Sequence, residues 1–411
     1  MAPANIDRLF RCTACAIICV IIANLYRPYL KNRRCASNCI RAGASGQEPA
    51  LLAMIPFRSA TTRRRTMTSS KLGQMQVNLT LAYVLNNAAT DKFGHGIPQP
   101  TAPQVKKIIV DRLNGSRMTR NDQFQIVWGP AIVYDKTDGY AANITAVLQS
   151  TATGEYSVVT SGTNFKSALD LLGDFSFSTL EPFSAYVPDC PPDARISAGT
   201  NGALFFVLDT PDSSRVKLAD FLRSVPPTSV VNVIGHSLGG ALASAIVLYL
   251  KHQSGLQAHT YNCQTFAAPT AGNAAFADYF NRQMRDRAVR VFNARDIVPM
   301  AWNADTILHV KDVYSDAGLD TPLDTKIAVD AVSLATRPLD YAQWGTSDLS
   351  ASVTTAMQYR LDGTVNGHIR DFSTQVGYQH IYEYMTCLDM ALSDIDIPGP
   401  GPGQVASPIN R

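Results

Sequence analysis

The chain has 411 residues, of which 46% are hydrophobic and 17% charged, so it is long enough to bury a large core in one or more domains. Its formal net charge of +3 hides an asymmetry, because residues 1–66 hold 11 basic and 2 acidic residues while the remainder holds 25 basic and 31 acidic ones. An acidic body without a basic run offers no electrostatic basis for binding nucleic acid, and we exclude that class of partner.

The first 66 residues differ in composition from the rest and are predicted to lie outside the folded domain. One apolar run, TACAIICVIIANL, is flanked by arginines, and five of the eight cysteines are in this segment. The run is short for a bilayer span and has the length of a signal-peptide apolar region. Three alternatives stay open: an export signal or short membrane anchor, an Arg-rich transit peptide, or a non-native upstream extension. The protein is therefore secreted, membrane-associated or cytoplasmic according to which of them holds.

From residue 67 to residue 395, helix-like and strand-like patterns alternate, and we predict one domain over this range. A helix pattern at 104–113 is followed by three short β-branched segments, at 125–135, 142–150 and 155–163. A helix is expected at 167–175, and further strands at 229–234, 258–266 and 288–293, with helices between them. This alternation predicts an α/β fold with a mostly parallel central sheet covered by helices on both faces. Residues 396–411 are rich in proline and glycine and are predicted to form a flexible tail.

The predicted domain contains a Gly-His-Ser-Leu-Gly sequence, residues 235–239, between a strand pattern and a long apolar helix pattern. Glycines on both sides of a serine permit the sharp turn that exposes a nucleophile at the end of a strand. The helix pattern that follows has no charged residue before Lys251, which is typical of a helix buried against a sheet. We interpret Ser237 as the nucleophile of an enzyme.

A serine hydroxyl needs a base and an acid that holds the base, and in this fold they follow the serine in the order acid, then histidine. Asp296 comes directly after the strand pattern at 288–293, whereas Asp278 lies inside a helix pattern and Asp286 precedes the strand. The carboxyl ends of strands are where such a fold gathers its site, so Asp296 is the predicted acid. Three histidines remain as candidate bases: His309, His368 and His380. His309 also fits a strand, because it lies in the alternating ILHVKDVY.

Four blocks, VVTSGTNF, GHSLGGALA, TFAAPTAGNAAFADYF and VRVFNARDIVP, together resemble the class 3, fungal-type lipases, which have the α/β-hydrolase fold. The resemblance covers roughly residues 155–300. It implies that Ser237 is the nucleophile, Asp296 the acid, and Thr163 the threonine of the oxyanion hole. It also implies a histidine on a loop before a last helix. His380 fits that place best, with His368 as the alternative base.

The expected mechanism follows from the chemistry of ester hydrolysis. His380 would take the proton of Ser237 during attack on an ester carbonyl, Asp296 would fix the imidazole, and water would hydrolyse the acyl-enzyme. The backbone N–H of Leu238 and Thr163 would stabilise the oxyanion. We expect no metal and no cofactor, because the chain has no zinc-binding spacing and no glycine-rich phosphate loop. Cys190, Cys263 and Cys387 also lack metal-ligand spacing and are expected to be buried hydrophobic residues.

The expected substrate is an ester or acylglycerol, bound at a lipid–water interface if the protein is a triacylglycerol lipase; no obligate protein partner is inferred. The sequence departs from the family at Ser161, where an arginine is usual. Residues 325–361 have helical apolar spacing and either form a second wall of the acyl pocket or add packing. Two alternatives stay open: a soluble carboxylesterase or feruloyl-type esterase, and a non-catalytic lipase-like module that binds a ligand.

Overall fold

The computed structural model describes residues 69–162, 176–345 and 357–398. Two compact units divide the chain, Met1–Lys71 and Leu72–Arg411, and of the first unit only Ser69–Lys71 are among the described residues. The predicted N-terminal extension of residues 1–66, the oxyanion candidate Thr163, the helix expected at 167–175 and most of the predicted tail lie outside the described residues.

The second unit is built on a seven-stranded sheet with the order β1-β2-β3-β6-β7-β9-β11. Its strands are β1 (Phe124–Tyr134), β2 (Ala141–Ser150), β3 (Tyr156–Thr160), β6 (Val230–His236), β7 (Thr260–Phe266), β9 (Ala288–Asn293) and β11 (Met357–Leu361). The first three strands form an antiparallel meander, and every pairing from β3 to β11 is parallel. The predicted mostly parallel sheet is confirmed.

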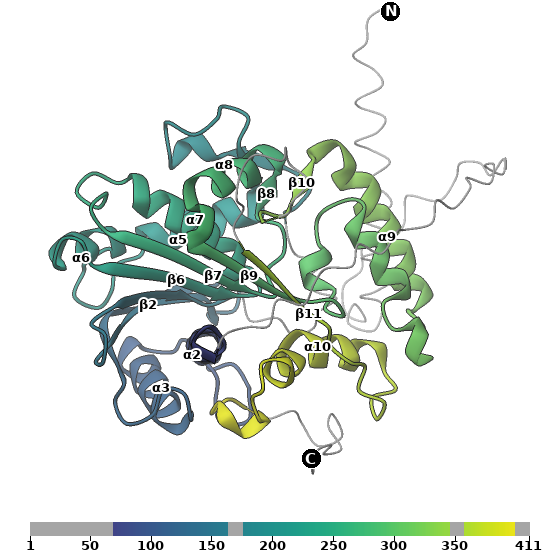
Figure 1. The fold of residues 1–411 in the computed structure, drawn as a ribbon, viewed down its shortest axis with the longest axis horizontal. Helices are drawn as coiled ribbons and strands as arrows, with labels where there is room; N and C mark the ends of the chain where they lie inside the picture. The colour runs from purple at the N-terminus through teal and green to yellow at the C-terminus, as the bar shows by residue number, and fades with distance from the viewer. Residues whose placement is uncertain (1–68, 163–175, 346–356, 399–411) are drawn as a thin grey trace, which may run out of the picture. The chain divides into compact units, whose positions relative to one another are not determined.

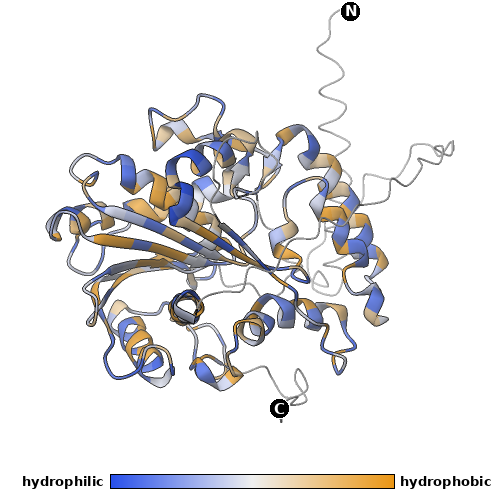
Figure 2. Ribbon diagram, viewed as in Figure 1, coloured by the Kyte–Doolittle hydropathy of each residue, from blue (hydrophilic) through white to orange (hydrophobic). Residues whose placement is uncertain are grey.

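Helices cover both faces of this sheet (Figure 1). One face carries α2 (Ser69–Asn86), α3 (Ala102–Gly115) and α10 (Phe372–Cys387), and the other carries α5 (Ala198–Asp209), α7 (Leu238–His252) and α8 (Ala274–Met284). The short α6 (Leu218–Ser224) precedes β6. α7 is buried along almost its whole length, as its uncharged sequence predicts, because it packs against β6 and β7 at the centre of the main core. Both the strands of the sheet and the helices around it, such as α9, carry apolar and polar segments (Figure 2).

The region between the predicted acid and the predicted base differs from expectation. The helical pattern predicted over residues 325–361 is confirmed at α9 (Leu323–Thr336) and is wrong at β11, a strand that pairs in parallel with β9 at the sheet edge. Residues 346–356 of this range lie outside the described residues. The strand expected around His309 is wrong, since residues Thr306–Asp312 form the 3-10 helix η5. A second, four-stranded sheet was not anticipated; it consists of β4 (Leu180–Pro182), β5 (Arg195–Ser197), β8 (Gly272–Asn273) and β10 (Tyr341–Ala342). Strands of two or three residues are too short to show periodicity.

A separate apolar cluster supports the loop after β9. Ile297 and Val298 follow Asp296 directly and pack in this cluster with Ile307 and Val310 of η5 and with Val329 of α9. The loop that carries Asp296, the predicted acid, is therefore held in place by this apolar cluster.

Two smaller expectations concern the cysteines and membrane insertion. Cys190 and Cys263 are buried as predicted, whereas Cys387 is only partly buried, and all three are free. Within the described residues, none of the helices has the length and apolarity that crossing a membrane requires.

Candidate active site

Ser237 lies at the sharp turn between β6 and α7, with φ 58° and ψ −132°. Such a strained conformation in a non-glycine residue is typical of functional sites. The flanking glycines allow close backbone approach: a Cβ on Gly235 would lie 2.0 Å from the carbonyl oxygen of Gly239, and a Cβ on Gly239 would lie 2.4 Å from that of Thr160. Neither position accepts a side chain without moving the backbone, so the glycine pattern is explained by the geometry of the turn.

The surroundings of Ser237 leave its hydroxyl free. The Oγ atom is buried and has no hydrogen-bond partner among the described residues. Leu238 begins α7, so its N–H is one of the unpaired donors at a helix N-terminus. Gly162 lies against this point, since a Cβ there would be 3.4 Å from the nitrogen of Leu238. Gly162, the residue before Thr163 in the sequence, thus lies beside the backbone N–H of Leu238, which is expected to stabilise an oxyanion.

Asp296 follows β9 on a short loop and its side chain is fully buried. Its Oδ2 atom accepts hydrogen bonds from Nδ1 of His380 and from the hydroxyl of Tyr384, both at 2.9 Å. Its Oδ1 atom accepts one from the N–H of Val298 at 3.0 Å. Three hydrogen-bond donors therefore converge on one buried carboxyl group.

The structure brings His380 to Asp296, but it corrects the expected position of the histidine in its element. His380 lies inside α10, not on a loop ahead of a helix. The helix begins at Phe372 because Asp371 caps it, accepting from the N–H of Thr374 at 2.7 Å. His380 is therefore held by a helix, with 12% of its side chain exposed. Its Nδ1 atom faces Asp296. No hydrogen bond joins the His380 side chain to the Oγ atom of Ser237.

The competing residues lie elsewhere. His368 and His309 are exposed, and the hydrogen bond of His368 that the structure records is from its backbone N–H to Asn366. Of the alternative acids, Asp286 is exposed and Asp278 is half-buried on α8. Among the described histidines, only His380 makes a hydrogen bond to Asp296.

Tyr384 is a member of this site that the sequence did not reveal. It lies one helical turn after His380, and its hydroxyl donates to Asp296 while accepting from the backbone N–H of Asn293 at 3.0 Å. Burial and the charge of Asp296 raise the pKa of Tyr384 well above its ordinary value, so the phenol stays a proton donor. The sequence signal for this role was that Tyr384 follows His380 by four residues, which puts both side chains on one face of a helix. The same spacing also fits ordinary core packing.

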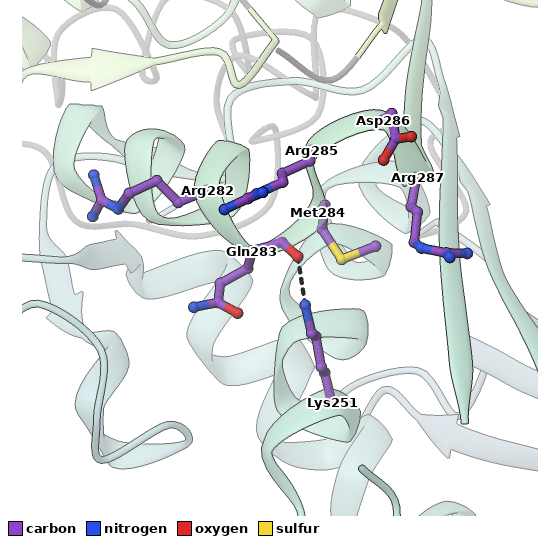
Figure 3. Close-up of a pocket in the computed structure, with 7 residues that line it drawn as sticks. All are labelled: Lys251, Arg282, Gln283, Met284, Arg285, Asp286 and Arg287. Carbon is purple, nitrogen blue, oxygen red and sulfur yellow. Dashed lines mark hydrogen bonds between the residues drawn. The ribbon is translucent and has the colours of Figure 1, made fainter. Parts of the chain in front are cut away.

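A hollow of about 430 Å³ elsewhere on the protein is lined by Lys251, Arg282, Gln283, Met284, Arg285, Asp286 and Arg287 (Figure 3). It lies around the C-terminus of α7 and the beginning of β9, at the opposite end of these elements from Ser237 and Asp296. The side chains of Arg282 and Arg287 point to opposite sides in Figure 3, so the positive charges do not converge on one point. None of the predicted catalytic residues lines this hollow.

Comparison with known proteins agrees with the motifs and the fold. Residues 157–306 match the family model described as Lipase (class 3). Over these residues the chain is similar to the class 3 lipases. The resemblance seen in the sequence is thereby confirmed. The helix that bears His380 lies outside the matched range, so the class 3 lipase match does not cover the whole site.

Two relatives and one solved structure show how far the similarity extends. A secreted mono- and diacylglycerol lipase of Malassezia globosa, LIP1, is 28% identical over 170 residues, 41% of this chain and 53% of that protein. A second one from the same organism, MDL4, is 32% identical over 144 residues, 34% of this chain and 45% of that protein. This chain thus spans about half the length of the curated relatives it matches. The crystal structure of M37 lipase is 25% identical with a TM-score of 0.65, covering 80% of this chain and 94% of that one. The fold is that of the α/β-hydrolases.

Proposed function

We propose that the chain is a serine-dependent carboxylic ester hydrolase acting on acylglycerols, with Ser237 as nucleophile, His380 as base and Asp296 as acid. The observation that carries this proposal is the 2.9 Å hydrogen bond between Nδ1 of His380 and the buried Oδ2 of Asp296, which follows the carboxyl end of β9 as Ser237 follows that of β6. With Ser237 as nucleophile, His380 as base and Asp296 as acid, the three residues would act in the order that acyl transfer requires.

In the proposed reaction, Asp296 holds the proton of His380 on Nδ1, which leaves Nε2 free to take the proton of Ser237. As the serine oxygen bonds to the ester carbonyl carbon, the imidazole becomes a cation that the adjacent carboxylate stabilises. His380 then gives the proton to the leaving alcohol, and the acyl-enzyme is hydrolysed by a water molecule that the same base activates. The hydrogen bond between Ser237 and His380 is expected to form when substrate binds, since catalytic hydrogen bonds are often long in free enzymes.

The oxyanion needs donors that are already in place. The N–H of Leu238 is proposed as one donor, because it begins α7 beside the nucleophile. Thr163 is retained as the second donor on the strength of the family resemblance alone. Removing one such donor typically costs about 100 to 1,000-fold in rate.

A stripe of exposed aliphatic residues on α9 favours a substrate at a lipid surface over a dissolved one. Leu323, Ile327 and Leu334 are 74%, 49% and 75% exposed, and their spacing puts them on one face of the helix. The buried side of α9 packs on the cluster that supports Asp296, so the helix lies in the same part of the protein as the proposed site. An amphipathic helix of this kind can lie in a lipid–water interface. We therefore propose a lipase rather than an esterase of dissolved substrates.

The decisive experiment compares wild type and Ser237→Ala on dissolved short-chain esters and on emulsified mono-, di- and triacylglycerols. The variant is expected to lose about a million-fold in kcat while keeping its fold. A wild-type rate that rises above the solubility limit of the substrate supports a lipase, and the preferred acylglycerol gives the finer specificity. Activity on dissolved esters alone would make the protein an esterase. Equal behaviour of the two proteins would leave a non-catalytic, ligand-binding module.

The choice of base has its own test. His380→Ala is expected to reduce hydrolysis to background, because the side chain bonded to Asp296 is lost. His368→Ala is the matched control, since it removes an exposed histidine of the same region. An active His380→Ala together with an inactive His368→Ala would reverse the assignment.

Secretion is proposed from the names of the two Malassezia relatives, both of which are described as secreted. The test is expression of the full chain in a secreting host and N-terminal sequencing of the protein found in the medium. Recovery of the whole chain inside the cells would contradict the proposal.

A further inference from the structure

A chain of three hydrogen bonds runs behind Ser237. The N–H of Gly162, just beyond β3, donates to Oδ1 of Asn86 at 2.9 Å. Nδ2 of Asn86 lies 3.0 Å from Nδ1 of His236, and Nε2 of His236 lies 2.9 Å from the backbone carbonyl oxygen of His380. Asn86 is the last residue of α2, and His236 is the residue before the nucleophile.

The groups at both ends of this hydrogen-bond chain require the same direction of hydrogen-bond donation along it. The carbonyl of His380 can only accept, so a neutral His236 must carry its proton on Nε2 and accept on Nδ1. The amide nitrogen of Asn86 then donates to Nδ1, and its oxygen is left to accept from the N–H of Gly162, which can only donate. Every donor and acceptor in the chain is satisfied by one arrangement of the amide and one tautomer of the imidazole.

His236 is held in the neutral form by its surroundings. It is 2% exposed, and its ring makes edge contacts with Tyr83, at 4.8 Å between centroids, and with Tyr384, at 6.1 Å. Burial, and next the neighbouring His380, lower the pKa of His236 well below its ordinary value. A proton on Nδ1 would point at the amide hydrogens of Asn86, so protonation of His236 would break the hydrogen-bond chain.

The three hydrogen bonds connect the parts of the proposed catalytic machinery. Gly162 lies against the nitrogen of Leu238, His236 precedes Ser237, and His380 bears the imidazole bonded to Asp296. We propose that Asn86 and His236 are positioning residues of the hydrolase, which hold the backbone at Gly162 and the helix of His380 in a fixed relation to Ser237. This rests on the function proposed above. Neither side chain acts on the substrate in this role; each acts through the backbone of a neighbour.

The sharpest test is Asn86→Asp, which keeps the size of the side chain and removes its donor. The carboxylate can still accept from Gly162 but has no proton for Nδ1 of His236, so the imidazole must change tautomer or become a cation. We expect kcat for a dissolved p-nitrophenyl ester to fall at least tenfold with KM within twofold, since a displacement of about 1 Å near the chemistry costs about 100-fold. The neighbouring Asn87→Asp is the matched control, because Asn87 follows α2 and its side chain donates to the carbonyl of Tyr83 in the last turn of that helix.

Two substitutions of His236 separate the two bonds of its ring. The amide nitrogen of His236→Gln can replace Nε2 and donate to His380, whereas the oxygen of His236→Asn replaces Nδ1 and accepts from Asn86. We expect His236→Gln to retain more kcat than His236→Asn, because its bond reaches the helix of the base. His259→Gln is the control: His259 is also buried and lies 3.2 Å from a carbonyl, that of Leu222, but outside the site. It is expected to lower the melting temperature without changing kcat.

Unchanged kcat in folded Asn86→Asp and His236→Asn would overturn the proposal, as would a loss of melting temperature alone. An independent readout is the imidazole nitrogen NMR spectrum of the full chain. Wild-type His236 is expected to show a proton on Nε2 at neutral pH, and Asn86→Asp a proton on Nδ1. This measurement does not depend on turnover. A wild type with the expected tautomer but no esterase activity would therefore refute the proposed function, and the opposite tautomer would refute the hydrogen-bond chain.

Discussion

Replacing Asp296 by asparagine is expected to abolish most of the activity while leaving the protein folded. The carboxyl group accepts three hydrogen bonds, from Nδ1 of His380, the hydroxyl of Tyr384 and the N–H of Val298. An asparagine has one acceptor oxygen and one amide group, so it cannot accept all three. The Val298 donor is fixed in the backbone, whereas an imidazole can change its tautomer. We therefore expect the asparagine oxygen to face Val298 and its amide nitrogen to face His380.

The size of the effect follows from this orientation. His380 would have to accept on Nδ1 and carry its proton on Nε2, where it cannot take the proton of Ser237. A wrong tautomer of this kind costs about 10,000-fold in kcat, or about 5.5 kcal/mol in the activation barrier. The hydroxyl proton of Tyr384 would lose its acceptor as well, and one unsatisfied buried donor costs about 1–3 kcal/mol of unfolding free energy. Activity is thus expected to fall far more than stability.

The assay is kcat and KM for a dissolved p-nitrophenyl ester, with the melting temperature measured on the same preparation. Asp286→Asn is the control, because Asp286 is exposed and is the neighbouring acid before β9; its kcat is expected to stay within twofold of wild type. A folded Asp296→Asn enzyme that kept more than a hundredth of the wild-type kcat would refute the role of Asp296.

Three further variants probe other parts of the fold. Tyr384→Phe is expected to lower the unfolding free energy by about 1–3 kcal/mol in urea denaturation, because it leaves the buried N–H of Asn293 unpaired; an unchanged midpoint would contradict this. Arg117 donates two hydrogen bonds to Asp394 and lowers the pKa of that carboxyl group below its ordinary value of 3.8. The pair therefore stabilises the fold fully above pH 3.8, and this stabilisation is lost as the pH falls through the lowered pKa of Asp394 in the folded protein. Arg117→Ala is expected to cost about 1 kcal/mol at pH 7, since Arg117 is half exposed, and the loss should shrink at pH 3; a pH-independent loss would argue against the pair. Changing both Leu323 and Leu334 to serine is expected to reduce hydrolysis of emulsified acylglycerol severalfold and leave dissolved esters unaffected; equal losses on both would remove α9 from lipid binding.

The sequence predicted Ser237 and Asp296 as candidate nucleophile and acid because both predictions depend on short stretches of chain. Glycines around Ser237 are required by a turn of five residues, and Asp296 follows directly on a strand whose β-branched residues are visible in the sequence. The apolar run after Ser237 predicted a buried helix, and the spacing of helices and strands predicted the parallel sheet. Each of these features is decided by neighbours along the chain, so local pattern was sufficient for them.

The tertiary structure decided what depends on pairs of residues far apart in the sequence. Of the three candidate histidines, it joins His380 to Asp296, because α10 packs where the His380 side chain reaches that residue, 84 positions away. It adds Tyr384, whose spacing by itself fits core packing, and Asn86, which meets His236 across 150 positions. It also places β11 in the sheet, where the sequence suggested a helix. No local periodicity encodes such contacts, because they form only when separate helices and strands are packed around one core.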